Sequence, residues 1–351
     1  MINKTNKCNN KDIEYILSKN KPIEDKLHVI VVISNPCLYK RRYELTGQFI
    51  KRMEKEPRVI VYVVELAYGK QKFALTSHSN SRHLQLRTET PLWHKENMIN
   101  LGVKYLLPSD YKAFAWIDSD IVFLNKDWAL DTLKILNGYK DIVQLFEQTQ
   151  HLNFEDKMST THYSAGFQYI NSSNRSMDRN SVYYWHPGFA WAITRSAYEK
   201  INGLYELAII GSGDYIMLEC LLQNVNKKRK YITGYGTDKY SLVDLQNKMK
   251  GLCFGYVPGI IKNFYHGSWK NRKYQERKNI ILQNHYDPSI HIEKDEMGII
   301  VPSKKFSNKF KKDIYNYFKE RNEDDIYELL KKNKTRKNKP HKNKTRRTPK
   351  L

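Results

Sequence analysis

Apolar residues follow two alternating patterns along the first half of the chain. Short runs rich in β-branched residues, such as Val29–Ile33, have the length and composition of buried strands. Between these runs, apolar residues recur at helical spacing, as Leu45, Phe49 and Met53 do. The predicted strands cover residues 27–34, 58–66, 111–117 and 142–146, and the predicted helices cover 41–54, 91–105 and 128–136. Strands that alternate with helices predict an α/β fold with a mixed, mainly parallel sheet flanked by helices.

The second half of the chain has a different pattern. Residues 148–187 are polar and predict a loop-rich segment, after which strands and helices resume. The predicted strands are 188–194 and 259–265, and the predicted helices are 196–201, 213–222, 239–250 and 273–284. Phe306, Phe310, Ile314 and Phe318 are each four residues apart, which predicts helices that dock the C-terminal region onto the core. A surface for a partner protein is the alternative interpretation of this stripe.

The composition is that of a soluble globular protein. The 351 residues are 40% hydrophobic and 13% aromatic, which suffices for a large core. The leader, residues 1–26, is polar and lacks the apolar centre of a signal peptide, and the apolar runs are too short to span a membrane. Four scattered cysteines without a Cys-x-x-Cys pair argue against a disulfide framework or a structural zinc site. These features predict a cytoplasmic protein, in a reducing compartment, with no transmembrane segment.

The basic charge is concentrated at the C-terminus. The formal net charge is +23, and residues 331–351 contain eleven Lys or Arg and no acidic residue. This segment repeats itself, as 332–336 and 342–346 show, and has almost no large apolar residues. We therefore expect a disordered, Lys/Arg-rich tail that contacts polyanions, or one that is simply solvated. Nucleic-acid binding through this tail is one alternative function of the chain.

Two carboxylates stand where a predicted strand ends. Asp118 and Asp120 follow the predicted strand 111–117, and side chains two residues apart in extended chain point to the same side. Such a pair can converge on one hard divalent cation, which prefers oxygen ligands. An ordinary turn is the alternative for an isolated Asp-Ser-Asp. Because ligands bind beyond the carboxyl ends of the strands in open α/β sheets, the position favours a metal site.

Three further segments carry candidate chemistry. His266 follows a predicted strand and precedes a glycine, and neutral imidazole is a good ligand for a divalent transition ion. Asp214 opens a predicted helix after two glycines, either as a general base or as an ordinary first-turn acid. Arg272 and Arg277 follow His266 and can neutralise phosphate. The third segment offers aromatic and small residues that can form a sugar-binding surface or belong to the core: Trp185, His186, Gly188 and Trp191.

The order of these motifs resembles that of GT-A glycosyltransferases. The closest resemblance is to a family-2-like group found in bacteria, phages and large DNA viruses, and it covers residues 27–300. The matching stretches are Asn35-Pro36, Trp93–Asn97, Trp116–Asp120, His186-Pro187-Gly188, Gly211–Met217, Gly255–Gly259 and His266-Gly267-Ser268. The resemblance implies a Rossmann-like nucleotide-sugar half over 27–147 and an acceptor half over 148–300. C-terminal helices over 301–330 and the tail lie outside it.

The resemblance also implies roles for individual residues. Asp118, Asp120 and His266 would hold Mn²⁺ or Mg²⁺, and Asp214 would be the catalytic base of an inverting enzyme. The chain departs from the family at Gly213, where family-2 enzymes commonly carry a glutamate, so a second carboxylate that orients the acceptor is missing. The residues implied to bind the nucleotide sugar are Asn35, Arg42, Glu65, Lys95, Asn97, Asp118, Arg272 and Arg277.

The resulting hypothesis is a metal-dependent glycosyltransferase. It would move a hexosyl-type sugar from a nucleotide-diphosphate sugar, UDP-sugar favoured, to an acceptor hydroxyl of a glycan, glycoconjugate or protein, with inversion. Two alternatives to this enzyme remain. One is a catalytically silent sugar- or nucleotide-sugar-binding module of the same fold, and the other is nucleic-acid binding through the basic tail. A nucleotidyltransferase is disfavoured because no glycine-rich phosphate loop follows the first strand, where residues 34–37 read Ser-Asn-Pro-Cys.

Overall fold

The structure is a computed structural model that describes residues 13–225, 239–274 and 276–337. Seven strands form its central sheet, in the order β11-β6-β10-β4-β1-β2-β3. Their bounds are β1 (Leu27–Ser34), β2 (Val59–Tyr68), β3 (His83–Thr88), β4 (Ala113–Ile117), β6 (Ile142–Gln144), β10 (Ala190–Thr194) and β11 (Phe254–Tyr256). All neighbours pair in parallel except β10, which runs antiparallel to β4 and β6. The predicted mixed, mainly parallel α/β sheet is confirmed.

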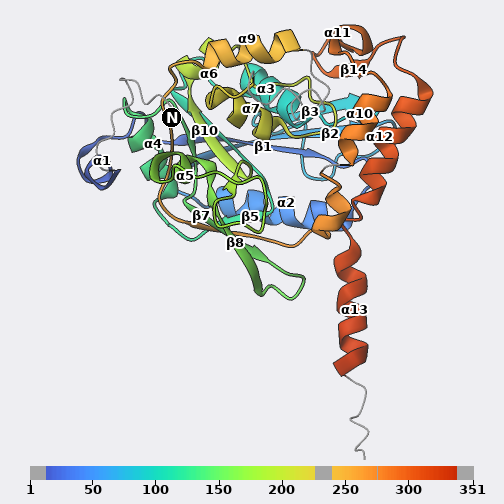
Figure 1. The fold of residues 1–351 in the computed structure, drawn as a ribbon, viewed down its shortest axis with the longest axis horizontal. Coiled ribbons are helices and arrows are strands. Elements are labelled where there is room, and N and C mark those ends of the chain that lie inside the picture. The colour runs from blue at the N-terminus through green and yellow to red at the C-terminus, as the bar shows by residue number, and fades with distance from the viewer. Residues whose placement is uncertain (1–12, 226–238, 275, 338–351) are drawn as a thin grey trace, which may run out of the picture.

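Alternate side chains of the central strands enter two separate cores, because successive residues of a strand point to opposite faces. On β1, Ile30 packs into the core beneath one set of helices, whereas Val29 and Val31 pack into the other core. The first face is covered by α3 (Lys95–Leu106), α7 (Gly213–Leu221) and α9 (Lys239–Met249), and the second by α1 (Ile13–Lys19), α2 (Lys40–Met53) and α4 (Trp128–Leu136). Figure 1 shows these helices on the two sides of the sheet.

A second sheet of five strands lies beside the first, in the order β5-β12-β7-β8-β9. Its strands are β5 (Ile121–Phe123), β7 (Gln148–Leu152), β8 (Met158–Ser164), β9 (Trp185–His186) and β12 (Ile260–Asn263), and α5 (Ala165–Asn171) follows β8. The prediction of a loop-rich segment over 148–187 is therefore wrong. Its strands bury polar residues, such as Thr149 and His151, so apolar alternation could not reveal them.

The C-terminal region packs against the main body as predicted. Phe306, Phe310, Ile314 and Phe318 are all buried, and they join one apolar cluster with Leu92 and Ile209. The elements of this region are α10 (Arg277–Gln283), α11 (Pro288–His291), β13 (Ile292–Lys294), β14 (Ile300–Pro302), α12 (Asn308–Glu320) and α13 (Asp325–Lys337). The remaining short helices are α6 (Arg195–Ile201) and the 3₁₀ helix η2 (Trp269–Arg272).

The two ends of the chain differ from the simple leader and tail expected from composition. The leader contains α1, whose Ile16 is buried. α13 continues to Lys337 and extends away from the main body in Figure 1, so the first residues of the expected disordered tail are helical. The rest of the tail, and with it the expected contact with polyanions, lies outside the described residues. None of the helices in the described part of the chain has the length and hydrophobicity of a membrane span.

The cysteines behave differently from one another. Cys37 and Cys220 carry free thiols, whereas Cys253 is disulfide-bonded. The scattered cysteines argue against a disulfide framework, and two free thiols beside one disulfide-bonded cysteine are not such a framework.

Candidate active site

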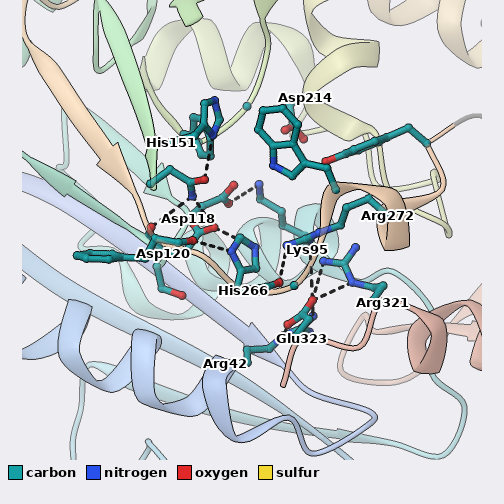
Figure 2. Close-up of a pocket in the computed structure, with 18 of the residues that line it drawn as sticks. Arg42, Lys95, Asp118, Asp120, His151, Asp214, His266, Arg272, Arg321 and Glu323 are labelled. Carbon is teal, nitrogen blue, oxygen red and sulfur yellow. Dashed lines mark hydrogen bonds and ion pairs between the residues drawn. The ribbon is translucent and has the colours of Figure 1, made fainter. Parts of the chain in front are cut away.

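A cavity of about 750 Å³ opens where the carboxyl ends of β1 and β4 meet the starts of α3 and α7. It brings together most of the charged residues that the sequence singles out. Among the residues that line it are Arg42, Lys95, Asp118, Asp120, His186, Gly188, Asp214, His266, Arg272 and Arg277. Figure 2 shows the two carboxylates and His266 on one side of this space and the arginine side chains on another. This is the edge at which open α/β sheets bind ligands.

Asp118 is the first residue after β4, and its backbone connects this strand end to the residue that precedes β10. Its N–H donates to the carbonyl of Phe189 over 2.7 Å. Its Oδ1 lies 2.6 Å from Nζ of Lys95, in the first turn of α3. Burial raises the pKa of Asp118 to about 6, and the charges of Asp120 and Asp214 add to this against the opposing effect of Lys95. Several carboxylates therefore share one confined space.

Asp120 and His266 face each other in a way that suits a cation. Nδ1 of His266 lies 2.9 Å from the carbonyl of Phe264, which can only accept, so this nitrogen carries the proton. Burial and the charge of Arg272 lower the pKa of His266 to about 3, so the ring is neutral. Its Nε2 then presents a lone pair 3.0 Å from Oδ2 of Asp120, and the other oxygen, Oδ1, is buried without a hydrogen bond among the described residues. Carboxylate and imidazole with unused lone pairs fit Mn²⁺ or a similar ion.

A cluster of arginines surrounds one buried carboxylate at the other side of the cavity. Glu323 is 1% exposed, and its Oε2 accepts from Nε of Arg42 over 2.8 Å, while its Oε1 lies 2.7 Å from Nη2 of Arg321. Nη1 of Arg272 lies 3.9 Å from the same Oε1, and its Nη2 donates to the carbonyl of His266 over 3.1 Å. Three guanidinium groups against one carboxylate leave this wall positively charged, as a diphosphate would require.

We expect Glu323→Gln to destabilise the protein by about 3–5 kcal/mol, because the substitution leaves buried guanidinium groups without their counter-charge. Although burial alone would raise it, the neighbouring Arg42 and Arg321 hold the pKa of Glu323 well below its usual value. The stabilisation is therefore present above the carboxyl group's unfolded pKa and is lost as pH falls below it. Urea unfolding at pH 7 and pH 4 measures both effects. Glu320→Gln, on the exposed end of α12, is the control, and equal stability of the two variants would contradict the prediction.

Asp214 lies in the first turn of α7 and reaches the cavity through a gap left by a glycine. A Cβ on Gly188 would lie 3.0 Å from Oδ2 of Asp214, so a larger residue at 188 would press against this carboxylate. Arg277 fixes the start of the helix, because its guanidinium contacts Oγ of Ser212 and also donates to the hydroxyl of Tyr317 over 2.9 Å. A carboxylate in the first turn of a helix lies at the positive end of the helix dipole.

Glu96 supplies a carboxyl group close to Gly213, where the family resemblance implies that one is missing. A Cβ on Gly213 would lie 2.1 Å from Oε1 of Glu96, so the α3 side chain occupies the room that a side chain at 213 would need. The second carboxyl group beside Asp214 thus comes from α3 and not from α7. Burial raises the pKa of Glu96 to about 8, with Asp214 adding to the rise and Lys95 opposing it. At neutral pH it is mostly protonated and can donate a hydrogen bond.

The pKa of Glu96 makes stability depend on pH in a definite direction. Between pH 4.5 and pH 8 the unfolded chain loses this proton while the folded chain keeps it, so the free energy of unfolding falls as pH rises. We expect Glu96→Gln, which mimics the protonated group, to be more stable than the wild type at pH 8 and to remove this slope. Urea unfolding at pH 5 and pH 8 checks it, with the exposed Glu199→Gln as control. An unchanged slope in Glu96→Gln would contradict the assignment.

Three predicted nucleotide-binding residues lie outside the lining of the cavity and bind the protein's own backbone. Asn35 bonds with both the N–H and the carbonyl of Tyr39. Glu65 accepts from the backbone of residues 74–76 and from the Thr76 hydroxyl. Asn97 donates to Glu206 and to the carbonyl of Gly298 and accepts from the N–H of Ile300. Polar residues near strand ends and helix starts can equally serve local structure, and sequence does not distinguish the two uses.

Two of the four predicted acceptor residues are core residues. Trp185 and Trp191 are 3% and 1% exposed, and their indole N–H groups donate to the carbonyls of Asn174 and Pro187. His186 and Gly188 do line the cavity. The aromatic side chains that line it and remain exposed are instead Trp269 and Tyr274, at 42% and 37%.

Other residues of the site were not predicted from the sequence. Asn263 and His151 line the cavity from the second sheet, and Arg179 lines it from the loop between α5 and β9. Arg321 and Glu323 come from the C-terminal region. The single available signal was the polar end of the strand that precedes His266, where Asn263 stands three residues before the histidine. Arg321 and Glu323 carry no local signal, because Arg42, the partner of Glu323, is 281 residues away.

Comparison with known proteins finds only distant structural similarity. No family model matches the chain, and no curated protein matches it. Among solved structures, the catalytic domain of Drosophila β1,4-galactosyltransferase 7, in complex with xylobiose, is similar with 13% identity and a TM-score of 0.33 over 67% of this chain. Staphylococcus aureus TarS is similar with 13% identity and a TM-score of 0.35 over 56% of this chain.

A third structure is the mannosyltransferase PcManGT from Pyrobaculum calidifontis in complex with GDP-Man and Mn²⁺, with 12% identity and a TM-score of 0.38 over 76% of this chain. The chain spans 65% of the galactosyltransferase domain, 55% of TarS and 67% of the mannosyltransferase. Because every one of these TM-scores is below 0.5, we base the function on the geometry of the site itself.

Proposed function

We propose that this chain is a GT-A glycosyltransferase that transfers a sugar from a nucleotide-diphosphate sugar to an acceptor hydroxyl with inversion. One observation carries the proposal: Asp120 and His266, the arginine wall and Asp214 all face the same cavity. These are the groups that such a transfer needs, namely a cation site, positive charge for a diphosphate and a base for a hydroxyl. A UDP-sugar donor is favoured, and a hexosyl group is the group that we expect to be transferred.

Asp120 and His266, together with the oxygen of Asp118 that does not contact Lys95, would hold Mn²⁺ or Mg²⁺. When bound, such an ion acts as a Lewis acid that stabilises negative charge on the leaving diphosphate. The chain's own cations contribute to the same stabilisation, because Lys95, Arg272 and Arg277 line the same cavity and need no movement to reach it. Preorganised positive charge of this kind favours the transition state over the ground state because charge develops only as the bond to the sugar breaks.

The carboxylate of Asp214 would accept the proton of the acceptor hydroxyl. The hydroxyl oxygen then forms the new bond to the anomeric carbon on the face opposite the departing diphosphate, which inverts the configuration. Glu96, protonated beside Asp214, supports the orientation of this helix start. The exposed rings of Trp269 and Tyr274 offer apolar faces for an acceptor at the cavity.

A panel of nucleotide sugars with Mn²⁺ tests the proposal. We expect one donor class to raise the melting temperature and to be turned over, with slow hydrolysis in the absence of an acceptor. Asp120→Ala should abolish both effects. A thermal shift without turnover, with any acceptor supplied, would favour the silent binding module, and no response to any donor would contradict the proposed function.

A further inference from the structure

Three buried histidines lie on three neighbouring strands of the second sheet. His151 is on β7, His162 on β8 and His186 on β9, and they are 4%, 6% and 6% exposed. Each offers a ring nitrogen, and the three nitrogens lie within 4.8 Å of one another. Among these histidines, His151 and His186 line the cavity, which gives an ion a path to the group.

Hydrogen bonds at the outer ends of two of these rings determine where their protons are. Nε2 of His162 lies 2.7 Å from the carbonyl of Arg179, which can only accept, so this nitrogen carries the proton. Nδ1 of His151 lies 3.1 Å from Oδ1 of Asn263. The orientation of that amide is fixed, because its Nδ2 donates to Oδ2 and to the backbone carbonyl of Asp120. Nδ1 of His151 therefore also carries a proton.

The inner nitrogens of the two rings are then left as lone pairs that face each other. Nε2 of His151 and Nδ1 of His162 are 2.9 Å apart. Two lone pairs repel at this distance unless a cation lies between them, either a proton or a metal ion. A shared proton joins only two of the rings, whereas a ring nitrogen of His186 lies within 4.8 Å of the same two nitrogens, so the group offers three ligands to one metal ion.

We propose that His151, His162 and His186 form a second metal site, which binds a divalent transition ion of the Zn²⁺ class. Imidazole nitrogen prefers such ions, whereas the carboxylate-containing pair of Asp120 and His266 suits Mn²⁺ or Mg²⁺. Asn263 and the Arg179 carbonyl act as the outer hydrogen-bond partners that orient ligating histidines in metalloproteins. Nδ1 of His186 accepts a 3.2 Å bond from the N–H of Gly188. Binding of the ion breaks this contact, because either Nδ1 becomes the ligand or the tautomer that frees Nε2 carries its proton on Nδ1.

An ion bound at this site would cross-link three strands that form one wall of the cavity. β8 pairs with β7 and β9, and Asn263 connects the histidines to Asp120 from β12. An ion bound here would stabilise the folded state by mass action, and would do so whether or not the chain transfers sugars. The proposal is thus independent of the proposed function.

Cobalt titration of the full-length, tag-free chain tests the second site after bound metal has been removed with a chelator. Co²⁺ is a spectroscopic probe, and its visible absorption distinguishes nitrogen-rich from oxygen-rich coordination. In His266→Ala, which disables the first site, we expect one Co²⁺ per chain with a nitrogen-rich spectrum, a raised melting temperature, and displacement by Zn²⁺ but not by Mg²⁺.

His162→Gln and His186→Phe, each made in the His266→Ala background, should lose this Co²⁺ equivalent and its spectrum. The ring of His186 stacks on that of Phe189, with their centroids 4.4 Å apart, and His186→Phe keeps an aromatic ring at this place. This variant therefore decides the outcome if His162→Gln does not fold. His28→Gln removes a buried imidazole on β1 and should bind as the parent does. Co²⁺ binding that survives both substitutions, or that is absent from the parent, would overturn the proposal in favour of a shared proton.

Discussion

Asp120→Asn should lower sugar transfer by about 10³-fold and weaken Mn²⁺ binding, while the protein stays folded. Loss of one preorganised group that stabilises charge in the transition state typically costs about 10²–10³-fold in rate, and this residue also serves to hold the ion. Its buried Oδ1 makes no hydrogen bond among the described residues, so the substitution disrupts little of the structure on that side. Turnover of the donor at saturating Mn²⁺ and calorimetric titration with Mn²⁺ measure the two effects.

Asp127→Asn is the matched control for the first prediction. Asp127 is an exposed carboxylate just before α4, outside the cavity, and its side chain makes no capping bond. It should leave transfer and Mn²⁺ affinity unchanged. Equal activity of Asp120→Asn and Asp127→Asn would remove Asp120 from the metal site, and a parallel loss in His266→Ala would support the pairing of the two residues.

Asp214→Asn should lower kcat by about 10²–10⁴-fold, the usual contribution of a general base, with little change in the KM for the donor. The amide cannot take a proton from the acceptor, whereas its shape preserves the contacts at the start of α7. Steady-state kinetics with saturating acceptor measures the loss. A fall in kcat/KM through KM alone would instead assign Asp214 to substrate binding.

Two measurements accompany the Asp214 variant. Asp244→Asn, whose side chain is 61% exposed on α9, is the control and should behave as the wild type. NMR of the product made by the wild type gives the anomeric configuration directly. Retained configuration would contradict inversion even if Asp214→Asn were inactive, because a retaining enzyme could also need this carboxylate.

Much of the fold follows from local patterns in the chain. The strand predicted at 27–34 and the helix predicted at 128–136 have the same bounds in the structure. Their apolar residues recur with the period of the element, and burial of those residues is what stabilises it. The predictions were wrong at 148–187, where β7 and β8 bury threonine and histidine side chains, and two of the histidines contact each other through their ring nitrogens. Periodicity of apolar residues cannot detect strands whose buried face is polar.

The residues of the candidate site could likewise be predicted from the sequence only in part. Asp118, Asp120 and Asp214 stand directly after a strand or in a first helical turn, and the structure places all three at one cavity, where their roles remain predictions. Glu65 and Asn97 have equally suggestive positions, yet their polar atoms are used by neighbouring backbone. The difference arises from which loop packs against each side chain, and sequence position alone carries no information on that.

By itself the sequence determined the class of fold, the edge of the sheet at which ligands bind, and the acidic and basic residues available there. These are consequences of apolar periodicity and of chain direction, which are local properties. Tertiary structure decided which polar groups are left with unused lone pairs. Asp120 faces His266 from a distant part of the chain, and Glu323 contacts Arg42 across 281 residues. Such contacts depend on long-range packing, so the charges that surround the cavity became visible only once the chain was folded.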